Sequence, residues 1–236
     1  MQVLKEISSG KSGGFMTFNS DSAIVVFSGG QDSTTCLYWA LKNYSKVETV
    51  FFDYGQRHVI ELESAKMIAE LAKVPLKVLT VDTLKQLGGN ALTDDREIDT
   101  ETESGLPNTF VPGRNLIFLT YAAAFAYQRG IPNLVTGVCE TDYSGYPDCR
   151  KNTMEALEQS LSLGMEAEFK IHTPLMNLDK KATVILANEL GAMEAMAFSH
   201  TCYEGQFPPC GSCPSCILRA KGFEEAGMKD PIFNRG

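Results

Sequence analysis

Apolar and polar positions follow two distinct patterns along this chain. Short apolar runs bounded by turn residues are typical of strands buried on both faces, whereas apolar residues spaced three or four apart indicate helices. The first pattern predicts strands at residues 23–27, 47–52, 76–81, 133–138, 171–173 and 195–198. The second predicts helices at residues 32–43, 58–73, 114–128, 149–163 and 180–190.

Strands that alternate with helices predict an α/β fold, namely a doubly wound parallel sheet with helices on both faces. Ligands of such sheets bind beyond the carboxyl ends of the strands. We expect a catalytic domain at 23–200, an N-terminal extension at 1–22, and a cysteine-rich segment with a C-terminal helix at 201–236. The long connection at 88–108 is rich in Asp, Glu and Thr, and we interpret it as a lid.

The first two predicted helices have an expected orientation. Asp32 is expected to cap the first of them at its N-terminus. The positions expected to be buried are Cys36, Leu37, Ala40 and Leu41 in the first helix, and Leu62, Ala65, Met67, Ala69 and Leu71 in the second.

Composition narrows the class of protein. With 236 residues, 44% of them hydrophobic, the chain can bury a full-sized core. A net charge of -8 opposes broad binding to nucleic acid, which depends on many Lys and Arg residues. No window approaches the ~20 consecutive apolar residues of a membrane span, and residues 1–22 lack the apolar stretch of a secretory signal. We therefore expect a soluble, cytoplasmic protein with no membrane partner and no broad nucleic-acid partner, while a small or tRNA-sized substrate held by a local patch stays open.

The run Ser28-Gly29-Gly30-Gln31-Asp32-Ser33 joins the first predicted strand to the first predicted helix. Glycines let a backbone approach an anion closely, and Ser28, Ser33 and the N–H groups at the helix start can donate hydrogen bonds. An ordinary glycine-rich turn is the alternative interpretation. Because strand, glycines and apolar helix occur in the order that a phosphate site needs, we predict a nucleotide site here.

A second run, Gly10-Lys11-Ser12, superficially resembles the end of a Walker motif. Lys5 stands where that motif requires a glycine, and no apolar strand precedes it. We therefore assign no phosphate-binding role to Lys11.

The cysteines cluster near the C-terminus, where Cys202, Cys210, Cys213 and Cys216 have the spacing C-x7-C-x2-C-x2-C. Four thiolates so close together are suited to a closed, tetrahedral, structural Zn²⁺ site. An iron–sulfur cluster is the main competitor, although the x3-Cys-Pro continuation of the ferredoxin run is missing. The isolated residues Cys36, Cys139 and Cys149 are interpreted as small buried apolar positions.

The loop at residues 28–33 resembles the pyrophosphate loop of the N-type ATP pyrophosphatases, or PP-loop superfamily. Those enzymes split ATP between its α and β phosphates and attach AMP to a substrate oxygen. Further blocks, at residues 53–58, 110–115, 142–150 and 173–176 and at Lys180, occur together with the four cysteines. The combination resembles the QueC family of 7-cyano-7-deazaguanine synthases, and the resemblance spans residue 23 to about residue 226.

This resemblance implies a Rossmann-type fold like that of the adenine nucleotide alpha hydrolases. It also implies a ligase that converts 7-carboxy-7-deazaguanine and ammonia into the nitrile used for queuosine, through an adenylated acid and an adenylated amide. ATP as a substrate, Mg²⁺ with the ATP, structural Zn²⁺ and a homodimer are further implications.

The expected site residues fall into four groups. The nucleotide is expected to contact Phe27, Ser28, Gly29, Gly30, Gln31, Asp32, Ser33, Thr34, Thr35, Cys36 and Leu37. Catalytic roles are expected for Asp32, Arg114 and Lys180, and substrate contacts for Tyr54, Gln56, Arg57, Asp142, Tyr143, Tyr146 and Asp148. The metal ligands are Cys202, Cys210, Cys213 and Cys216.

Within these groups, several assignments stay open. Either Asp142 or Asp148 is expected to accept hydrogen bonds from the deazaguanine N1–H and 2-amino group, while Tyr143 and Tyr146 stack on the ring. Lys180 is followed by a second lysine, so the sequence does not decide between the two. A minor role as a base for ammonium is assigned to His58.

Two other functions compete with this reading. A tRNA thiolase with the same loop would need a basic face for tRNA and a catalytic cysteine pair near the loop, and the net charge and the lone Cys36 oppose it. An interaction module built on the four cysteines would leave the loop vestigial, which its intact sequence opposes.

Overall fold

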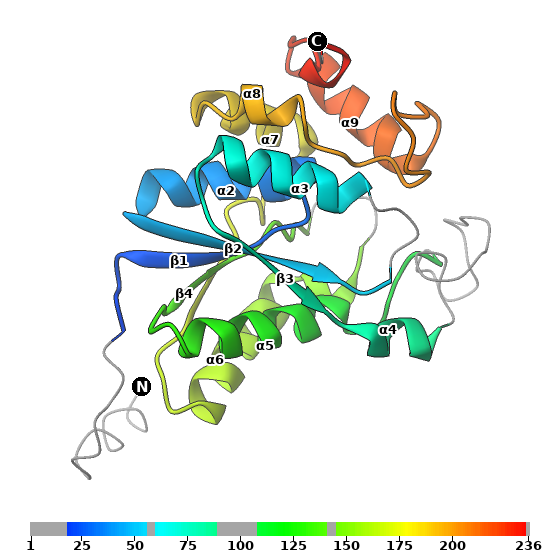
Figure 1. Cartoon of the computed structure of the whole chain (residues 1–236). Coiled ribbons are helices and arrows are strands. Elements are labelled where there is room, and N and C mark those ends of the chain that lie inside the picture. The colour runs from blue at the N-terminus through cyan, green and yellow to red at the C-terminus, as the bar shows by residue number, and fades with distance from the viewer. Residues whose placement is uncertain (1–17, 56–59, 89–107, 141–144, 235–236) are drawn as a thin grey trace.

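The computed structural model describes residues 18–55, 60–88, 108–140 and 145–234, which are drawn in colour in Figure 1. The expected extension at 1–22 and lid at 88–108 fall largely outside these ranges. The expected functional residues outside them are Gln56, Arg57, His58, Asp142 and Tyr143. Within the described ranges, no helix is long and apolar enough to cross a membrane.

The central sheet has parallel strands in the order β3-β2-β1-β4-β5 (Figure 1). The strands are β1 (Ser22–Val26), β2 (Lys46–Asp53), β3 (Leu76–Thr80), β4 (Asn133–Val135) and β5 (Lys170–His172). In register, Ala23 of β1 lies opposite Val47 of β2 and Asn133 of β4. The chain runs outward from β1 to β3 and then returns to the other side of β1, so the topological switch point lies between β1 and β4.

Helices cover both faces of this sheet, which confirms the predicted doubly wound α/β fold. They are α2 (Gln31–Asn43), α3 (Ile60–Leu71), α4 (Asp82–Leu87), α5 (Arg114–Tyr127), α6 (Lys151–Gly164), α7 (Lys180–Glu189), α8 (Met193–Met196) and α9 (Pro214–Glu225). Short 3-10 turns lie at Pro147–Cys149 and Pro231–Asn234. Figure 1 shows α2, α3, α7 and α8 on one face and α5 and α6 on the other.

The core explains why β1 is apolar at successive positions. Ala23 and Val25 belong to the cluster that contains buried residues of α2 and α3, whereas Ile24 belongs to the cluster on the α5 side. All three side chains are fully buried. Full burial of a Val or Ile side chain contributes roughly 1.5–3 kcal/mol, so both layers hold the strand in place.

The predicted strand at 195–198 is wrong. The chain instead forms the short helix α8, in which the N–H of Met196 donates to the carbonyl oxygen of Ala192 at 2.8 Å. Ala195 and Met196 are fully buried. A short, wholly buried apolar run has no readable period, and Ala and Met favour helices.

Strand β4 is also shorter than predicted, because it ends at Val135 rather than at residue 138. One further ladder-like contact follows, from the Thr136 N–H to the His172 carbonyl oxygen at 3.0 Å. The chain then leaves the sheet at Gly137, beside the first turn of α2.

The orientations of α2 and α3 are partly as predicted. Gly30, not Asp32, is the N-cap of α2, and no side chain caps this helix end. Leu41 and Met67 were expected to be buried but are 36% and 48% exposed. The buried stripe of a helix advances by 3.6 residues per turn, so it passes through Ile68 and leaves Met67 toward solvent.

The C-terminal helix α9 packs on α7. Their contact shares an apolar cluster that includes Val184 and Phe223, and a Cβ placed on Gly222 would lie 2.9 Å from the Cβ of Lys180. Buried Arg219 donates from Nε to Asp230 at 2.6 Å and from Nη1 to Ser199 Oγ at 2.8 Å. The segment after residue 200 is therefore firmly attached to the helices that flank the sheet.

Candidate functional site

A cavity of about 340 Å³ opens at the carboxyl ends of β1 and β4, which is the switch point of the sheet. On one side it is lined by residues of the predicted loop, and on the other by residues that follow β2 or belong to α3 and α5. We call residues 28–33 together with Gly137 the loop wall. We call Tyr54, Glu61, Arg114 and Tyr146 the charged wall.

The loop wall depends on glycines at two close backbone contacts. Gly29 has a φ of +76°, and a Cβ there would lie 2.6 Å from the backbone nitrogen of Ala65 and 2.9 Å from the carbonyl oxygen of Glu61. A Cβ on Gly137 would lie 3.2 Å from Ser33 N. The loop is thus held between α3 and the end of β4. Only glycine fits at position 29, whereas a Cβ at position 137 would require its neighbours to shift by a few tenths of an ångström.

Hydroxyl groups brace the loop from within. Ser33 Oγ accepts from the Ser28 N–H at 3.2 Å and lies 3.1 Å from Ser28 Oγ. Thr34 Oγ1 donates to the Gly30 carbonyl oxygen at 2.8 Å. Gln31, Asp32 and Ser33, at the start of α2, line the cavity, and the dipole of a helix favours an anion at this end.

Not every residue expected at the nucleotide reaches the cavity. Its lining includes Phe27, Ser28, Gly30, Gln31, Asp32 and Ser33. Gly29, Thr34, Thr35, Cys36 and Leu37 are buried and are absent from that lining. The second group supports the loop from behind.

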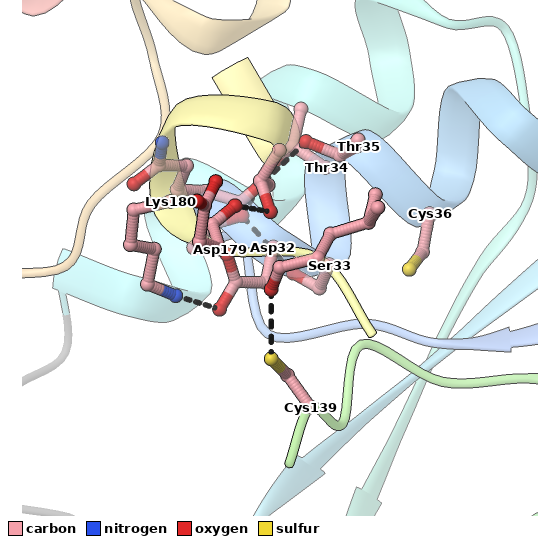
Figure 2. Close-up of polar contacts among 12 residues, drawn as sticks. Asp32, Ser33, Thr34, Thr35, Cys36, Cys139, Asp179 and Lys180 are labelled. Carbon is pink, nitrogen blue, oxygen red and sulfur yellow. Dashed lines mark hydrogen bonds and ion pairs between the residues drawn. The ribbon is translucent and has the colours of Figure 1, made fainter. Parts of the chain in front are cut away.

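Asp32 and Lys180 form an ion pair beside the loop. Lys180 Nζ donates to Asp32 Oδ2, and Figure 2 shows this contact. The two atoms are 2.7 Å apart, and the side chains of Lys180 and Asp32 are 16% and 25% exposed, respectively. Lys181 is exposed. Lys180 is therefore the lysine that α7 brings to the loop.

The placement of Lys180 has two local causes. Asp179 caps α7, since its Oδ1 accepts from the Ala182 N–H at 2.7 Å. Gly222 of α9 lets that helix approach the backbone of Lys180. Both contacts fix the first turn of α7, from which Lys180 reaches Asp32.

Two buried polar atoms at the start of α2 lack a partner within the described part of the chain. They are Asp32 Oδ1 and Gln31 Nε2. A buried acceptor and a buried donor rarely stay unpaired in a protein interior. Because they lie beside the cavity and the glycine loop, they fit the predicted site for a nucleotide and its cation.

The charged wall assembles around Arg114 at the start of α5. Arg114 Nη1 donates to Tyr54 Oη at 3.4 Å, and the guanidinium carbon lies 5.8 Å from the Tyr54 ring centre. Burial alone lowers the pKa of Arg114, but interaction with Tyr54, Tyr146 and Asp148 outweighs burial and raises it. Arg114 therefore stays a cation beside the cavity.

Glu61 was not singled out by the sequence analysis. It lies in the first turn of α3, is partly buried and lines the cavity. Burial raises the pKa of its carboxyl group to about 7, although the nearby Arg114 acts in the opposite direction. An amphipathic helix with several Glu residues gives no signal in the sequence that one of them lines a cavity.

Tyr146 and Asp148 differ in their position relative to the cavity. Tyr146 lines it, and its Oη lies 2.6 Å from Thr109 Oγ1. Asp148 is 4% exposed, does not belong to the lining, and accepts from the Asn115 N–H at 3.0 Å. This contact holds the start of α5, and contact of Asp148 with a substrate stays a prediction.

The three isolated cysteines are not alike. Cys36 is fully buried, as expected, and its burial, followed by the charge of Asp32, raises the pKa of its thiol. Cys139 and Cys149 are only partly buried and line the cavity. Cys139 Sγ donates to the Leu178 carbonyl oxygen at 3.2 Å, while Cys149 Sγ accepts from Asn115 Nδ2 at 3.3 Å.

Cys202, Cys210, Cys213 and Cys216 meet in one cluster, with all four sulfur atoms within 4.8 Å of one another. In a tetrahedral site with Zn–S bonds of about 2.3 Å, the sulfurs lie about 3.8 Å apart. Cys210 Sγ and Cys216 Sγ are separated by 3.8 Å. The four cysteines thus fit a single metal ion, and they leave no position open for a substrate.

The cysteine cluster is joined directly to the cavity. Thr201, Tyr203 and Ser215 line the cavity and are interleaved with the cysteines in sequence. The His200 N–H donates to the Gly29 carbonyl oxygen at 2.9 Å. Burial raises the pKa of the Tyr203 hydroxyl. The sequence analysis did not predict a role for Tyr203.

Comparison with known proteins places the chain among similar sequences. Residues 22–227 match the family described as "Queuosine biosynthesis protein QueC". The chain is 61% identical over 222 residues to a 7-cyano-7-deazaguanine synthase of Chromobacterium violaceum, which covers 92% of this chain and 95% of the relative. It is 58% identical over 218 residues to the enzyme of the same name from Laribacter hongkongensis, covering 91% and 95%.

The fold also has solved counterparts. The U34-tRNA thiolase NcsA from Methanococcus maripaludis, determined with its 4Fe-4S cluster, aligns with a TM-score of 0.50 and 14% sequence identity. The alignment covers 94% of this chain and 69% of the thiolase. At this level of identity the likeness concerns the fold alone.

Proposed function

Because this chain belongs to the QueC family of queuosine biosynthesis proteins, we propose that its cavity converts 7-carboxy-7-deazaguanine, ammonia and ATP into 7-cyano-7-deazaguanine. The chain is an enzyme of the 7-cyano-7-deazaguanine synthase class, the name its relatives carry. The observation that carries the mechanism is the pairing of two unlike walls around one cavity. A phosphate-binding loop lies on one side, and a cation with aromatic rings lies on the other.

Removing two oxygens from a carboxylate requires two activations. A carboxylate does not exchange oxygen for ammonia directly, because oxide would have to leave. In the first half, a carboxylate oxygen attacks the α-phosphorus of ATP, pyrophosphate leaves, and an acyl adenylate forms. Ammonia then attacks the acyl carbon, and AMP and one proton leave to give the amide.

The second half repeats the activation on the amide. The amide oxygen attacks the α-phosphorus of a second ATP, pyrophosphate leaves, and the nitrogen loses one proton. The carbon–oxygen bond then breaks, AMP departs with that oxygen, and the nitrogen loses its remaining proton. One loop serves both halves when the amide stays bound in the cavity.

The charges around the cavity suit this chemistry. Lys180, held by Asp32, lies at the loop where negative charge develops on the departing pyrophosphate. Arg114 faces the cavity from the other side, where it can neutralise the substrate carboxylate. Cations fixed in place before the reaction stabilise a transition state without further reorganisation.

The metal requirements follow from the ligands. Mg²⁺ binds ATP phosphates and carboxylate oxygens, and Asp32 Oδ1 offers an unpaired carboxylate oxygen near the loop. Zn²⁺ is the metal we assign to the four cysteines, because a closed set of four thiolates suits it. In that role Zn²⁺ would hold the cysteine segment that carries Tyr203.

Recognition of the deazaguanine stays as the sequence analysis left it. We assign the N1–H and 2-amino group to Asp142 or Asp148, and ring stacking to Tyr143 and Tyr146. Of these residues, Tyr146 has a side chain that lines the cavity in the described part of the chain. A homodimer is the assembly we expect, and sedimentation analysis would test it.

One assay tests the function. Purified protein is incubated with 7-carboxy-7-deazaguanine, ammonium, Mg²⁺ and ATP, and the products are identified by mass spectrometry. We expect the nitrile together with AMP and pyrophosphate, in a ratio of two AMP per nitrile. Release of ADP and phosphate, or absence of the nitrile, would contradict the proposal.

A further inference from the structure

We propose that Glu61 is the proton acceptor of this site, the group that removes protons from the reacting nitrogen in both halves of the reaction. The inference rests on the proposed function, since that reaction releases protons from nitrogen. Glu61 belongs neither to the loop nor to the cysteine cluster, and it is not among the residues predicted to bind the substrate.

Position is the first argument. The carbonyl oxygen of Glu61 belongs to the helix turn that contacts Gly29, so Glu61 lies next to the loop that holds the phosphates. Its side chain lines the cavity together with that of Arg114. In each half a substrate oxygen bonds to the α-phosphorus, and the carbon–oxygen bond of the adenylate then breaks as AMP leaves. With the phosphates at the loop and the substrate carboxylate at Arg114, both bonds lie between the loop and Arg114, beside Glu61.

Protonation state is the second argument. Within the described part of the chain, the groups that act on Glu61 are the Arg114 guanidinium of α5 and, through their mutual interaction, the Tyr54 hydroxyl after β2. Burial raises the pKa of the Glu61 carboxyl group to about 7. A general base works best when its pKa lies near the working pH, because it is then both available and sufficiently basic.

A base is needed only in the steps that release protons. Adenylation of the carboxylate moves no proton. Attack of ammonia on the acyl adenylate releases one proton from nitrogen, and conversion of the amide into the nitrile releases two more. Each of these protons passes to the Glu61 carboxylate, which returns it to solvent before the next one leaves.

The test separates adenylation from the proton-releasing steps. For Glu61→Gln, pyrophosphate release from ATP and the acid without ammonium should stay within about 3-fold of wild type, because no proton leaves in that step. Amide formation with ammonium, and nitrile formation from added amide, should each fall on the order of 10²-fold. Glu63→Gln is the matched control, since Glu63 is exposed in the same helix turn and its variant should behave as wild type in every step.

A pH profile gives a readout that a merely structural role would not move. In wild type, at a constant concentration of un-ionised ammonia, single-turnover amide formation should rise as pH increases through about 7 and then level off, since the carboxylate is the active form. Glu61→Gln should lose this rise, and Glu61→Asp should recover part of the rate. Equal slowing of adenylation and amide formation, or an unchanged profile in Glu61→Gln, would overturn the inference.

Folding controls keep the result interpretable. The folded-state pKa of Glu61, about 7, lies above its ordinary value of 4.5, so the free energy of unfolding falls as pH rises between these two values and stays lower at higher pH. Glu61→Gln should therefore unfold at an equal or higher temperature than wild type at pH 8. If wild type itself made no amide or nitrile, both the proposed function and this inference would be wrong. If wild type made both products but Glu61→Gln did not behave as expected, only the inference would be wrong.

Discussion

The loop wall and the charged wall face the same cavity but are built differently. The loop wall is nearly continuous in sequence, and its shape depends on close backbone contacts at Gly29, where a Cβ would clash, and at Gly137, where a Cβ would be tightly packed. The charged wall gathers Tyr54, Glu61, Arg114 and Tyr146 from four separate parts of the chain. The pKa values of Tyr54 and Arg114 are shifted by burial and by the charges of the other members.

This difference teaches which changes each wall tolerates. A backbone contact at 2.6 Å, as at Gly29, leaves no room for an added methyl group, so even a small change in the loop wall should have a large effect there. Electrostatic interactions vary gradually with distance, so removing one hydroxyl from the charged wall should have a modest effect. Variants in the two walls should therefore differ in the size of their effects.

Lys180→Met should cause the largest loss of activity. It removes the cation paired with Asp32 at 2.7 Å, and we expect AMP formation to fall on the order of 10³-fold. The exposed neighbour provides a control, Lys181→Met, which should keep most of its activity. Asp32→Ala should likewise abolish AMP release, and normal turnover in that variant would refute the loop assignment.

Gly29→Ala should damage the loop wall through the backbone. The new Cβ would lie 2.6 Å from Ala65 N at a φ of +76°, and we expect destabilisation of at least ~2 kcal/mol together with about 10²-fold weaker ATP binding. Chemical unfolding and calorimetric titration measure the two effects. Gly164→Ala, in a helix with nothing within 4 Å of the new atom, should leave both unchanged.

Cys213→Ser tests whether the cysteine segment supports the cavity. Loss of one thiolate should lower the bound metal measured by mass spectrometry and lower the unfolding temperature, since structural zinc contributes on the order of 10 kcal/mol to folding. Because Tyr203 lines the cavity, the Michaelis constant for the acid should rise as well. Glu204→Gln, an exposed change in the same segment, should affect none of these quantities.

Tyr54→Phe should have the smallest effect. It removes the hydroxyl that accepts from Arg114 Nη1 at 3.4 Å but keeps the ring, and we expect a loss of about 2- to 10-fold in kcat/KM. Steady-state kinetics with varied acid would show it. A loss as large as that of Gly29→Ala would mean that the charged wall is as intolerant as the loop wall.

The fold was predictable because its signals are local. The apolar runs of β1, β2 and β3, the glycines after β1 and the cysteine spacing each occupy a few consecutive residues, and the structure confirms the α/β class. The resemblance to the QueC family, carried by motifs of the same kind, is confirmed by relatives of up to 61% identity. The strand predicted at 195–198 failed because a buried apolar run of that length has no readable period.

The charged wall was less predictable, because burial and electrostatic environment are not properties of a single position. Arg114 and Tyr54 were expected on the basis of the family resemblance, whereas Glu61 and Tyr203 gave no signal in the sequence. Two adjacent lysines also look alike until the start of α7 turns Lys180 toward Asp32.

The alternation of strands and helices, the glycine loop and the group of four closely spaced cysteines follow from the sequence alone, because each depends on neighbouring residues. Only the tertiary structure decided which carboxylate lies in the cavity with a pKa near 7, which lysine reaches the loop, and that the cysteine segment lines the cavity. Those outcomes depend on the sheet bringing distant segments together, and burial then changes the chemistry of ordinary side chains.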